Sequence, residues 1–348
     1  MMGRTYLDHN ATAPLRPEAK AAMMAAMEAV GNPSSVHSEG RAARAIVERA
    51  RAQIAEALGA GEADIVFTSG ATEAAGLALR GRDLLGAAVE HDAVRAWVDE
   101  RLEVGRDGQV QLVEPARATL QLANSETGIV QDLPTGLAVS DVTQGFGKLP
   151  FAFSWSGLGM AIASAHKIGG PKGVGILVMP RGSDPAPLIR GGGQEQGWRA
   201  GTENVIGIAG FGAAAEAAAR DLAQGVWDEV AERRDLMEKA IAAASDQTIF
   251  VGNTGQRLPN TSCLIAPGWK GETQVMAMDL AGFAISAGSA CSSGKVRESR
   301  VLAAMGFAPD ECASAIRVSL GPETTDEDVL RFADSWTARY SKQRARVA

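Results

Sequence analysis

Lys167 is a candidate for covalent chemistry because a lysine amine can form a Schiff base with a carbonyl compound. It ends the segment SAHK at 164–167, which closes a predicted strand and leads into the glycine-rich turn 169–173. Small residues on both sides let a planar ligand approach the amine. Burial would lower the pKa of the lysine, because desolvation disfavours the ammonium, and the neutral amine is the nucleophile. A surface lysine in a glycine-rich turn is the alternative, and the motif alone gives the two interpretations equal weight.

The segment TSGATE at 68–73 has the residue types of an anion site. It joins a short apolar run to a helix, and the start of a helix presents free backbone N–H groups. Neighbouring hydroxyls add donors, and together these groups suit a phosphate. An ordinary helix cap, with Ser69 or Thr72 as the capping residue, is the alternative and is favoured by the segment taken alone.

Asp141 begins the segment DVTQ at 141–144, at the end of another predicted strand. Open α/β sheets place ligands at the carboxyl ends of their strands. An aspartate there can hold a protonated ring nitrogen through a charge-assisted hydrogen bond. An isolated aspartate at such a position would more often be a turn residue.

Cys291 lies in the small-residue segment SACSSG at 289–294, with Lys295 and Arg297 close by in the sequence. Nearby cations stabilise a thiolate, so this cysteine is the one best placed to react. Cys263 and Cys312 lie in apolar or helical surroundings and are expected to be buried and inert.

Two glycine-rich segments resemble nucleotide-binding motifs. The segment 210–215 fits G-x-G-x-x-A, but it leads into an alanine-rich helix without the acidic residue that a dinucleotide site needs. We expect it to serve close helix packing. Gly145–Lys148 is followed by Leu149 rather than Ser or Thr, so it is not a P-loop.

These segments need a framework of alternating strands and helices. Strands are predicted at 64–68, 84–89, 109–113, 119–123, 137–142, 160–164, 174–179, 248–251, 262–265, 284–287 and 316–319. Helices are predicted at 17–30, 38–58, 74–80, 272–281, 299–305 and 325–342, with one or two more within 202–244 that bridge to a second domain. The predicted fold class is α/β. A large domain, 15–244, has a mostly parallel sheet flanked by helices, a smaller α/β domain covers 245–348, and an N-terminal arm, 1–14, packs with the small domain.

The connection between the predicted strands 119–123 and 137–142 is unusual. A parallel crossover usually contains a helix. The stretch 128–136 has little helical pattern, so we expect a bare loop and a thinly covered patch of sheet.

Composition sets the class of protein. The chain has 348 residues, a net charge of −7 and 46% hydrophobic residues, which predicts a globular protein with a sizeable core rather than a disordered one. The acidic balance argues against nucleic-acid binding, which needs a basic face. We see no apolar stretch of about 18 residues and no leader sequence, so we expect no membrane contact and a cytoplasmic location. Three cysteines without a C-x-x-C motif and four histidines without ligand spacing predict neither a disulfide framework nor a metal site.

Taken together, the motifs resemble those of fold type I pyridoxal-phosphate enzymes of the class V aminotransferase group, and more narrowly the NifS/IscS-type cysteine desulfurases. The resemblance runs from Tyr6 to Glu327 and rests on many segments in the right order. They are YLDHNAT (6–12), GNPSSVHSEGR (31–41), FTSGATE (67–73), EHDAV (90–94), ANSETG (123–128), SDVTQGFGKLP (140–150), SAHKIGGPKGVG (164–175), GGGQEQGWRAGTEN (191–204), SAGSACSSGKV (286–296) and IRVSLG (316–321). The stretches between His91 and Asn124 and between Gly128 and Asp141 are shorter than in typical members.

The resemblance implies a role for each matching residue. Lys167 would bind pyridoxal 5'-phosphate as a Schiff base and later move the Cα proton, His91 would stack over the ring, and Cys291 would attack the substrate sulfur. Asp141 would pair with the ring nitrogen and Gln144 with the ring hydroxyl. The remaining cofactor-binding positions are Ala71, Thr72, Ser164, His166 and Thr202, the last reaching the neighbouring subunit, and the substrate carboxylate would bind Asn124 and Arg317.

The resemblance also implies a reaction and partners. L-cysteine would give L-alanine and a persulfide on Cys291. A homodimer would hand the sulfur to an acceptor protein, such as an iron–sulfur scaffold, for iron–sulfur cluster or thio-cofactor biosynthesis. Selenocysteine lyase activity, another class V aminotransferase-type reaction, and a low-turnover sulfur-carrying partner remain as alternatives.

Overall fold

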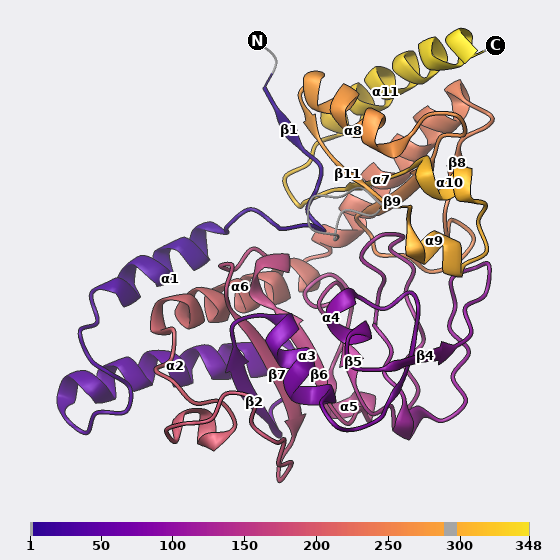
Figure 1. Ribbon diagram of the computed structural model, residues 1–348. Coiled ribbons are helices and arrows are strands. Elements are labelled where there is room, and N and C mark those ends of the chain that lie inside the picture. The colour runs from indigo at the N-terminus through magenta and orange to yellow at the C-terminus, as the bar shows by residue number, and fades with distance from the viewer. Residues whose placement is uncertain (1–2, 289–297, 348) are drawn as a thin grey trace.

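A computed structural model describes residues 3–288 and 298–347 of the chain (Figure 1). The predicted nucleophile Cys291 lies outside the described residues. The helices are α1 (Pro17–Met27), α2 (Ser38–Ala57), α3 (Ala71–Leu79), α4 (Asp92–Arg95), α5 (Phe153–Ser156), α6 (Val205–Ala223), α7 (Val226–Ala244), α8 (Gly271–Leu280), α9 (Arg300–Ala304), α10 (Pro309–Ala313) and α11 (Asp326–Val347), with 3₁₀ turns η1 (Pro115–Arg117), η2 (Ala165–Lys167) and η3 (Gln194–Gly197). The strands are β1 (Thr5–Tyr6), β2 (Ala63–Thr68), β3 (Leu85–Ala87), β4 (Asp99–Leu102), β5 (Ser140–Asp141), β6 (Ala161–Ser164), β7 (Gly175–Pro180), β8 (Ile249–Phe250), β9 (Thr261–Ile265), β10 (Phe283–Ala284), β11 (Ser286–Ala287) and β12 (Ala315–Ser319).

The larger sheet has the strand order β2-β7-β6-β5. Beyond β5 it continues through isolated parallel bridges of the segment 118–119 to β3, which pairs with β4. β5 and β6 run parallel, whereas β7 is antiparallel to both of its neighbours, β2 and β6. Every pairing that does not involve β7 is parallel, so the prediction of a mostly parallel sheet is confirmed.

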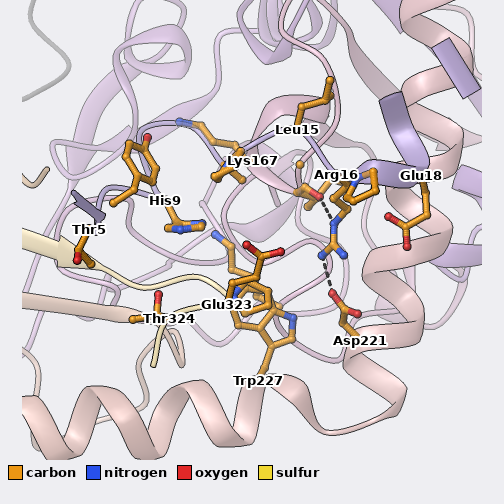
Figure 2. Close-up of a pocket in the computed structure, with 18 of the residues that line it drawn as sticks. Thr5, His9, Leu15, Arg16, Glu18, Lys167, Asp221, Trp227, Glu323 and Thr324 are labelled. Atoms are coloured by element: carbon orange, nitrogen blue, oxygen red, sulfur yellow. Dashed lines mark hydrogen bonds and ion pairs between the residues drawn. The ribbon is translucent and has the colours of Figure 1, made fainter. Parts of the chain in front are cut away.

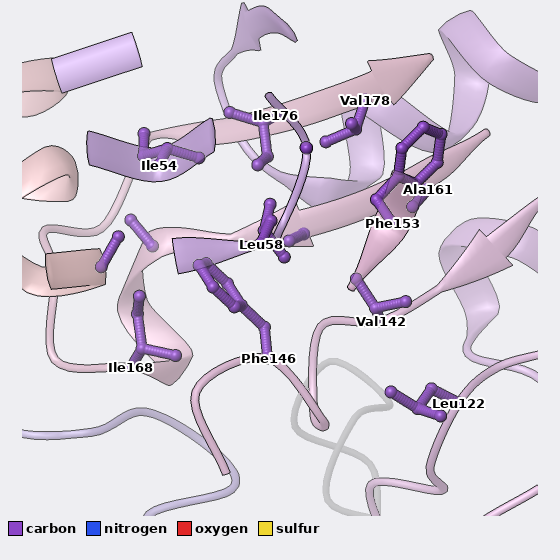
Figure 3. Close-up of a cluster of buried hydrophobic side chains, with 14 of the residues drawn as sticks. Ile54, Leu58, Leu122, Val142, Phe146, Phe153, Ala161, Ile168, Ile176 and Val178 are labelled. Atoms are coloured by element: carbon purple, nitrogen blue, oxygen red, sulfur yellow. The ribbon is translucent and has the colours of Figure 1, made fainter. Parts of the chain in front are cut away.

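β7 explains why this sheet carries helices on both faces. Ile176 and Val178 join the core that contains Ile54 of α2 and Phe211 of α6, and part of this core is drawn in Figure 3. Leu177, between them, joins a separate core with side chains of α3. Successive side chains of a strand point to opposite faces, so an all-apolar strand must be covered on both sides.

The C-terminal part has its own sheet and core. The strands β11-β12-β9-β8 form an antiparallel sheet, and α7, α8 and α11 contribute to the adjacent hydrophobic cluster. The rings of Trp269 and Tyr340 stack at 5.9 Å, and Trp336 lies 5.2 Å from Tyr340. The N-terminal strand β1 pairs in parallel with β10 of this part. None of the helices in the described part of the chain combines the length and apolar character needed to cross a bilayer.

The region between β4 and β5 differs most from the expectation. The predicted strands 109–113 and 119–123 form isolated bridges, such as Val104 with Val110, rather than strands. Around 109–113 a side chain supplies hydrogen bonds: Gln131 Nε2 donates to Gly108 O at 2.7 Å, and its Oε1 accepts from Val110 N at 3.0 Å. The segment 119–123 bonds through its backbone to both neighbouring strands, with Thr119 N donating to Leu85 O and Leu122 N to Asp141 O, each at 2.9 Å. The expected bare crossover is confirmed, because residues 124–138 contain turns but no helix.

The segment 210–215 packs helices, as predicted. It lies within α6, where a Cβ on Gly210 would come 2.6 Å from Met23 of α1 and one on Gly212 would come 2.6 Å from Ala50 of α2. Glycine at these two positions lets three helices approach closely.

Candidate active site

A cavity of about 540 Å³ opens where β5 and β6 end and α3 begins. This is the edge at which open α/β sheets bind ligands. Most of the residues predicted to be functional line it together: Ala71, Thr72, His91, Asp141, Gln144, Ser164, His166 and Lys167. Its wall also includes residues that were not predicted, among them Asn10, Ala11, Thr12, Gln121, Thr143 and Lys172.

Lys167 is half-buried in the cavity wall and is not part of an open surface turn. It ends η2, directly after β6. Its Nζ donates to two backbone oxygens of the N-terminal arm, Asn10 O at 2.7 Å and Ala11 O at 2.8 Å. Behind it the turn folds back so tightly that a Cβ on Gly170 would lie 2.9 Å from Ala165. The glycine-rich turn therefore fixes the position of the amine.

The start of α3 is shaped to hold an anion. Its N-cap residue is Gly70, and no side chain of the described residues caps it there, so neither Ser69 nor Thr72 acts as the cap. Gly175 of β7 lies directly against this turn, because a Cβ there would come 2.4 Å from Gly70 C and 2.8 Å from Ala71 N. The turn leaves the first N–H groups of a nine-residue helix facing a cavity with hydroxyls beside them.

Asp141 and its neighbours form the polar side of the cavity. Asp141 Oδ1 accepts from Thr143 N at 2.9 Å. Thr143 Oγ1 is buried and has no hydrogen-bond partner within the described residues, although it lies in the cavity wall. Buried hydroxyls are normally paired, so this atom indicates a polar ligand. Gln144 Nε2 donates to Asn10 O at 3.0 Å.

Two histidines complete the wall. His91 is the N-cap residue of α4, and its Nδ1 accepts the backbone N–H of Ala93 at 3.1 Å. Burial, together with the charges of Lys167 and Lys172, lowers the pKa of His166 to about 4. His166 is therefore neutral at neutral pH and can donate a hydrogen bond without adding charge.

Sequence reasoning missed two buried ionisable groups next to the cavity, Glu90 and Lys148. Burial and the nearby charge of Asp141 raise the pKa of Glu90 to about 8. Burial, Lys167 and Arg317 lower the pKa of Lys148 to about 7. Both residues lie in segments that the sequence analysis considered for other reasons. Glu90 precedes His91, the residue expected to stack over the ring, and Lys148 ends the segment that was rejected as a P-loop. The four-residue spacing of Gln144 and Lys148 is the signal that could have drawn attention to the lysine.

Three predicted residues lie outside the cavity wall as the structure describes it. The side chain of Asn124 holds a turn: its Nδ2 donates to Val89 O at 3.0 Å, and its Oδ1 accepts from Thr127 N at 2.8 Å. Arg317 of β12 is 3% exposed and pairs with Asp8 at 2.7 Å. Thr202 lines a smaller neighbouring cavity.

The groups in the main cavity fit pyridoxal phosphate. A lysine amine is available for a covalent link, a carboxylate for the ring nitrogen, and a helix start with hydroxyls for the phosphate. Thr143 Oγ1 supplies a buried polar atom that still needs a partner. No cluster of ligating side chains for a metal ion occurs in the described ranges 3–288 and 298–347.

Known proteins resemble this chain along nearly its whole length. The family model for aminotransferase class-V matches residues 5–332. A cysteine desulfurase of Frankia sp. (strain EuIK1) is 40% identical over 379 residues, covering 94% of this chain and 89% of the relative. A cysteine desulfurase of Cereibacter sphaeroides is 39% identical over 372 residues, covering 96% and 95%. The X-ray structure of a NifS-like protein from Rickettsia africae ESF-5 superposes with a TM-score of 0.88 at 31% identity, covering 97% of this chain and 99% of that one.

Proposed function

This chain belongs to the class V aminotransferase family and is a pyridoxal-phosphate-dependent cysteine desulfurase, and we propose that Lys167, His91 and Cys291 are its catalytic residues. The observation that carries the assignment of roles is the meeting of Lys167, Asp141 and the start of α3 in one cavity. The names of the relatives favour this reaction over a selenocysteine lyase, another aminotransferase-type reaction or a low-turnover sulfur carrier.

In this proposal the cofactor is held at three places. The first turn of α3, through the Ala71 N–H and Thr72, binds the phosphate together with Ser164 and His166, with Thr202 as a further contact across the dimer. Asp141 accepts a hydrogen bond from the protonated ring nitrogen, and Gln144 reaches the ring hydroxyl. When bound, the cofactor supplies an electron sink for cleavage of the substrate Cα–H bond.

The chain's own residues then bind the substrate and move protons. Arg317 and Asn124 bind the carboxylate of L-cysteine, with a two-pronged contact from the guanidinium. Lys167 Nζ takes and returns the proton at Cα, and His91 holds a proton near the leaving sulfur. The Cys291 thiolate bonds to that sulfur as its bond to Cβ breaks, and the products are L-alanine and a persulfide on Cys291.

The experiment combines labelling with two variants. Borohydride treatment of the cofactor-loaded protein, followed by peptide mapping, is expected to place the label on Lys167 and not on Lys172, which lines the same cavity. Lys167→Ala is expected to abolish alanine formation, and Cys291→Ser to abolish the persulfide. Lys20→Ala, at an exposed position, and Cys263→Ala, at a buried one, are the matched controls. Label on another residue, or wild-type persulfide in Cys291→Ser, would contradict the proposal.

We further propose three structural units: an arm, 1–14, a cofactor-binding unit, 15–244, and a small unit, 245–348, with α7 as the bridging helix. Pairing of β1 with β10 supports the arm. Separate hydrophobic clusters support the two units, and α7 joins the second one through Trp227 and Met237. Limited proteolysis that cuts first inside either unit would contradict this division.

We also propose a homodimer that acts in the cytoplasm and passes sulfur to an acceptor protein such as an iron–sulfur scaffold. Cys263 and Cys312 are unpaired and buried, which suits a reducing compartment. Apolar side chains exposed on and after α1 suit an interface between copies: Met24, Met27, Val30 and Val36. A monomeric mass by light scattering would contradict the homodimer. Failure to transfer labelled sulfur to a purified scaffold protein would contradict the proposed acceptor.

A further inference from the structure

Lys148 is a buried lysine to which the proposed reaction gives no role. It is 3% exposed and forms no ion pair with any described residue. Together with Lys167 and His9 it lines a second cavity, of about 690 Å³. Figure 2 shows Lys167 and His9 in the wall of this cavity. Burying a lysine without a counter-ion costs free energy, so its position calls for a local reason.

The backbone carries Lys148 inward, next to Gln144. Phe146 N donates to Val142 O at 2.8 Å, and Leu149 N donates to Gly145 O at 2.9 Å, so the chain makes a helical turn here. The side chains of Gln144 and Lys148 meet across this turn, with Lys148 Nζ 3.0 Å from Gln144 Oε1. Gly147 has φ +69°, and a Cβ there would come 2.7 Å from Ala218 of α6. This close packing presses the turn against α6 and keeps Gln144 and Lys148 adjacent.

A chain of hydrogen bonds joins the two lysines through Gln144. Lys148 Nζ donates to Gln144 Oε1 at 3.0 Å, and Gln144 Nε2 donates to Asn10 O at 3.0 Å. Lys167 Nζ donates to the same oxygen of Asn10 at 2.7 Å. A carbonyl oxygen only accepts, so Asn10 O must face the Gln144 Nε2 group, and Gln144 Oε1 then accepts from Lys148 Nζ. In that orientation the second hydrogen on Nε2 is left for a ligand in the main cavity.

The surrounding charges oppose the ammonium form of Lys148. Lys167 and Arg317 are cations, and together with burial they lower the pKa of Lys148 to about 7. The lysine is therefore about half protonated at neutral pH, and charge strengthens its hydrogen bond to Gln144 Oε1 only in the ammonium form. The 3.0 Å contact with Gln144 Oε1 is what holds the amine, because Lys148 forms no ion pair within the described residues.

We propose that Lys148 is a positioning residue, which fixes the amide of Gln144 so that its N–H points to the ring hydroxyl of the cofactor. The inference rests on the proposed function, specifically on the contact between Gln144 and that hydroxyl. Lys148 therefore acts through Gln144, and without Gln144 it should have little effect on cofactor binding.

The test is a double-mutant cycle of Lys148→Met and Gln144→Ala. Pyridoxal phosphate is titrated into each apoprotein, and affinity is read from protein fluorescence. We expect Lys148→Met to weaken binding about 10-fold in the wild-type background, as for loss of one hydrogen bond, and at most about 2-fold in the Gln144→Ala background. Lys20→Met, at an exposed position, should change nothing.

A second readout separates positioning from a structural effect. The visible absorbance band of the bound cofactor should shift in Lys148→Met, shift similarly in Gln144→Ala, and shift no further in the double variant. Equal losses of affinity in both backgrounds would mean that Lys148 acts as a charge, and no loss in the wild-type background would mean that it does not act at all. Either result overturns the inference.

The apoproteins' unfolding temperatures check folding, and Lys148→Leu repeats the cycle if the methionine variant does not fold. The outcome is also distinct from failure of the proposed function. If borohydride does not label Lys167 in the wild type, the proposed function fails. If Lys167 is labelled but the cycle has no coupling, this inference alone fails.

Discussion

At the scale of single residues, Glu90 is held in the fold with one oxygen paired and the other without a partner among the described residues. Its Oε1 accepts from Gln121 N at 2.8 Å, and its Oε2 is the unpaired atom. Burial and the nearby charge of Asp141 raise the pKa of Glu90 from 4.5 to about 8. The carboxyl is therefore neutral at neutral pH, which leaves Asp141 as the anion beside the proposed ring nitrogen.

This pKa predicts how stability depends on pH. Glu90 binds its proton up to pH 8 in the folded protein but only up to 4.5 in the unfolded chain. Folding takes up a proton between these values, so the stability contributed by this group is full below pH 4.5 and is lost as the pH rises to 8. In Glu90→Gln this loss should be absent. The free energy of unfolding of the variant, relative to that of the wild type, should therefore rise by up to about 1.4 kcal/mol per pH unit over this range.

Urea unfolding of both apoproteins at several pH values between 5 and 8 measures the difference. Glu232→Gln, at an exposed position, is the control and should follow the wild-type curve. Parallel curves for wild type and Glu90→Gln would mean that Glu90 is ionised in the fold.

The buried ionisable groups were the part of the site that the sequence could not predict. Lys167 and Asp141 stand at the ends of apolar runs that predict strands, so their place at the edge of the sheet followed from pattern. Glu90 is buried against a distant segment, where it accepts from Gln121 N, and no local pattern of residue types encodes that contact. The spacing of Gln144 and Lys148 indicates that they can pair, but it does not predict that Gln144 also bonds to Asn10 of the distant arm.

At the scale of elements, the loop 191–204 is tied down by Glu195. Glu195 Oε1 accepts from Arg51 Nη2 at 2.8 Å, and Oε2 accepts from Arg51 Nη1 at 3.0 Å and from Phe67 N at 2.7 Å. Glu195 and Gln196 have φ of +46° and +58°, a region that side-chain-bearing residues rarely adopt. The ion pair with α2 and the bond to β2 hold this strained turn, and through it the loop that carries Thr202.

Glu195→Gln should therefore destabilise the protein by about 3 kcal/mol, because it removes the buried carboxylate from Arg51 and leaves only the exposed Glu48 as its ion-pair partner. Glu48→Gln is the matched control on the same arginine. Glu48 has 53% of its side chain exposed, whereas Glu195 has 3%. Loss of the Glu48 carboxylate should lower the free energy of unfolding by less than about 1 kcal/mol.

Denaturant unfolding of the two variants decides the comparison, and cofactor titration should reveal weaker binding in Glu195→Gln alone. Equal destabilisation by the two substitutions would mean that the buried pair contributes no more than the exposed one.

Elements that are buried on both faces were the most predictable ones. The apolar run of β7 and the segment that becomes β6 were placed within one residue of their bounds. The antiparallel direction of β7 was not predicted, because strand direction depends on how the turn 169–173 folds back. The segment 109–113 did not form a strand, and the side chain of Gln131 bonds to the backbone there. The segment 119–123 lies in the sheet, with backbone hydrogen bonds to Leu85 O and Asp141 O, but it forms isolated bridges instead of a continuous ladder.

At the scale of the whole molecule, two hydrophobic clusters support two units of the fold. The centre of the second is Trp336, which is fully buried, packs against Tyr340 and Trp269, and donates from Nε1 to Gln274 Oε1 at 3.0 Å. Trp155, by contrast, is 90% exposed on α5.

Trp336→Ala should lower the free energy of unfolding by about 3–5 kcal/mol, because it removes a large buried ring and the donor to Gln274 Oε1. Trp155→Ala is the matched control and should change stability by less than about 0.5 kcal/mol. Chemical unfolding followed by circular dichroism measures both. A loss below about 1 kcal/mol in Trp336→Ala would mean that this core contributes little to the whole.

The short arm that holds the lysine amine also ties the two units to each other. Asn10 offers its carbonyl to Lys167, while its backbone N–H donates to Ser319 Oγ at 3.0 Å in the small unit. Two residues earlier, Asp8 forms an ion pair with Arg317 of the same sheet. A rigid-body displacement of that sheet would therefore drag the arm with it and pull the carbonyl from the amine. If Arg317 binds the substrate carboxylate as proposed, arrival of that carboxylate would compete with Asp8 and would thereby be coupled to release of the Lys167 amine.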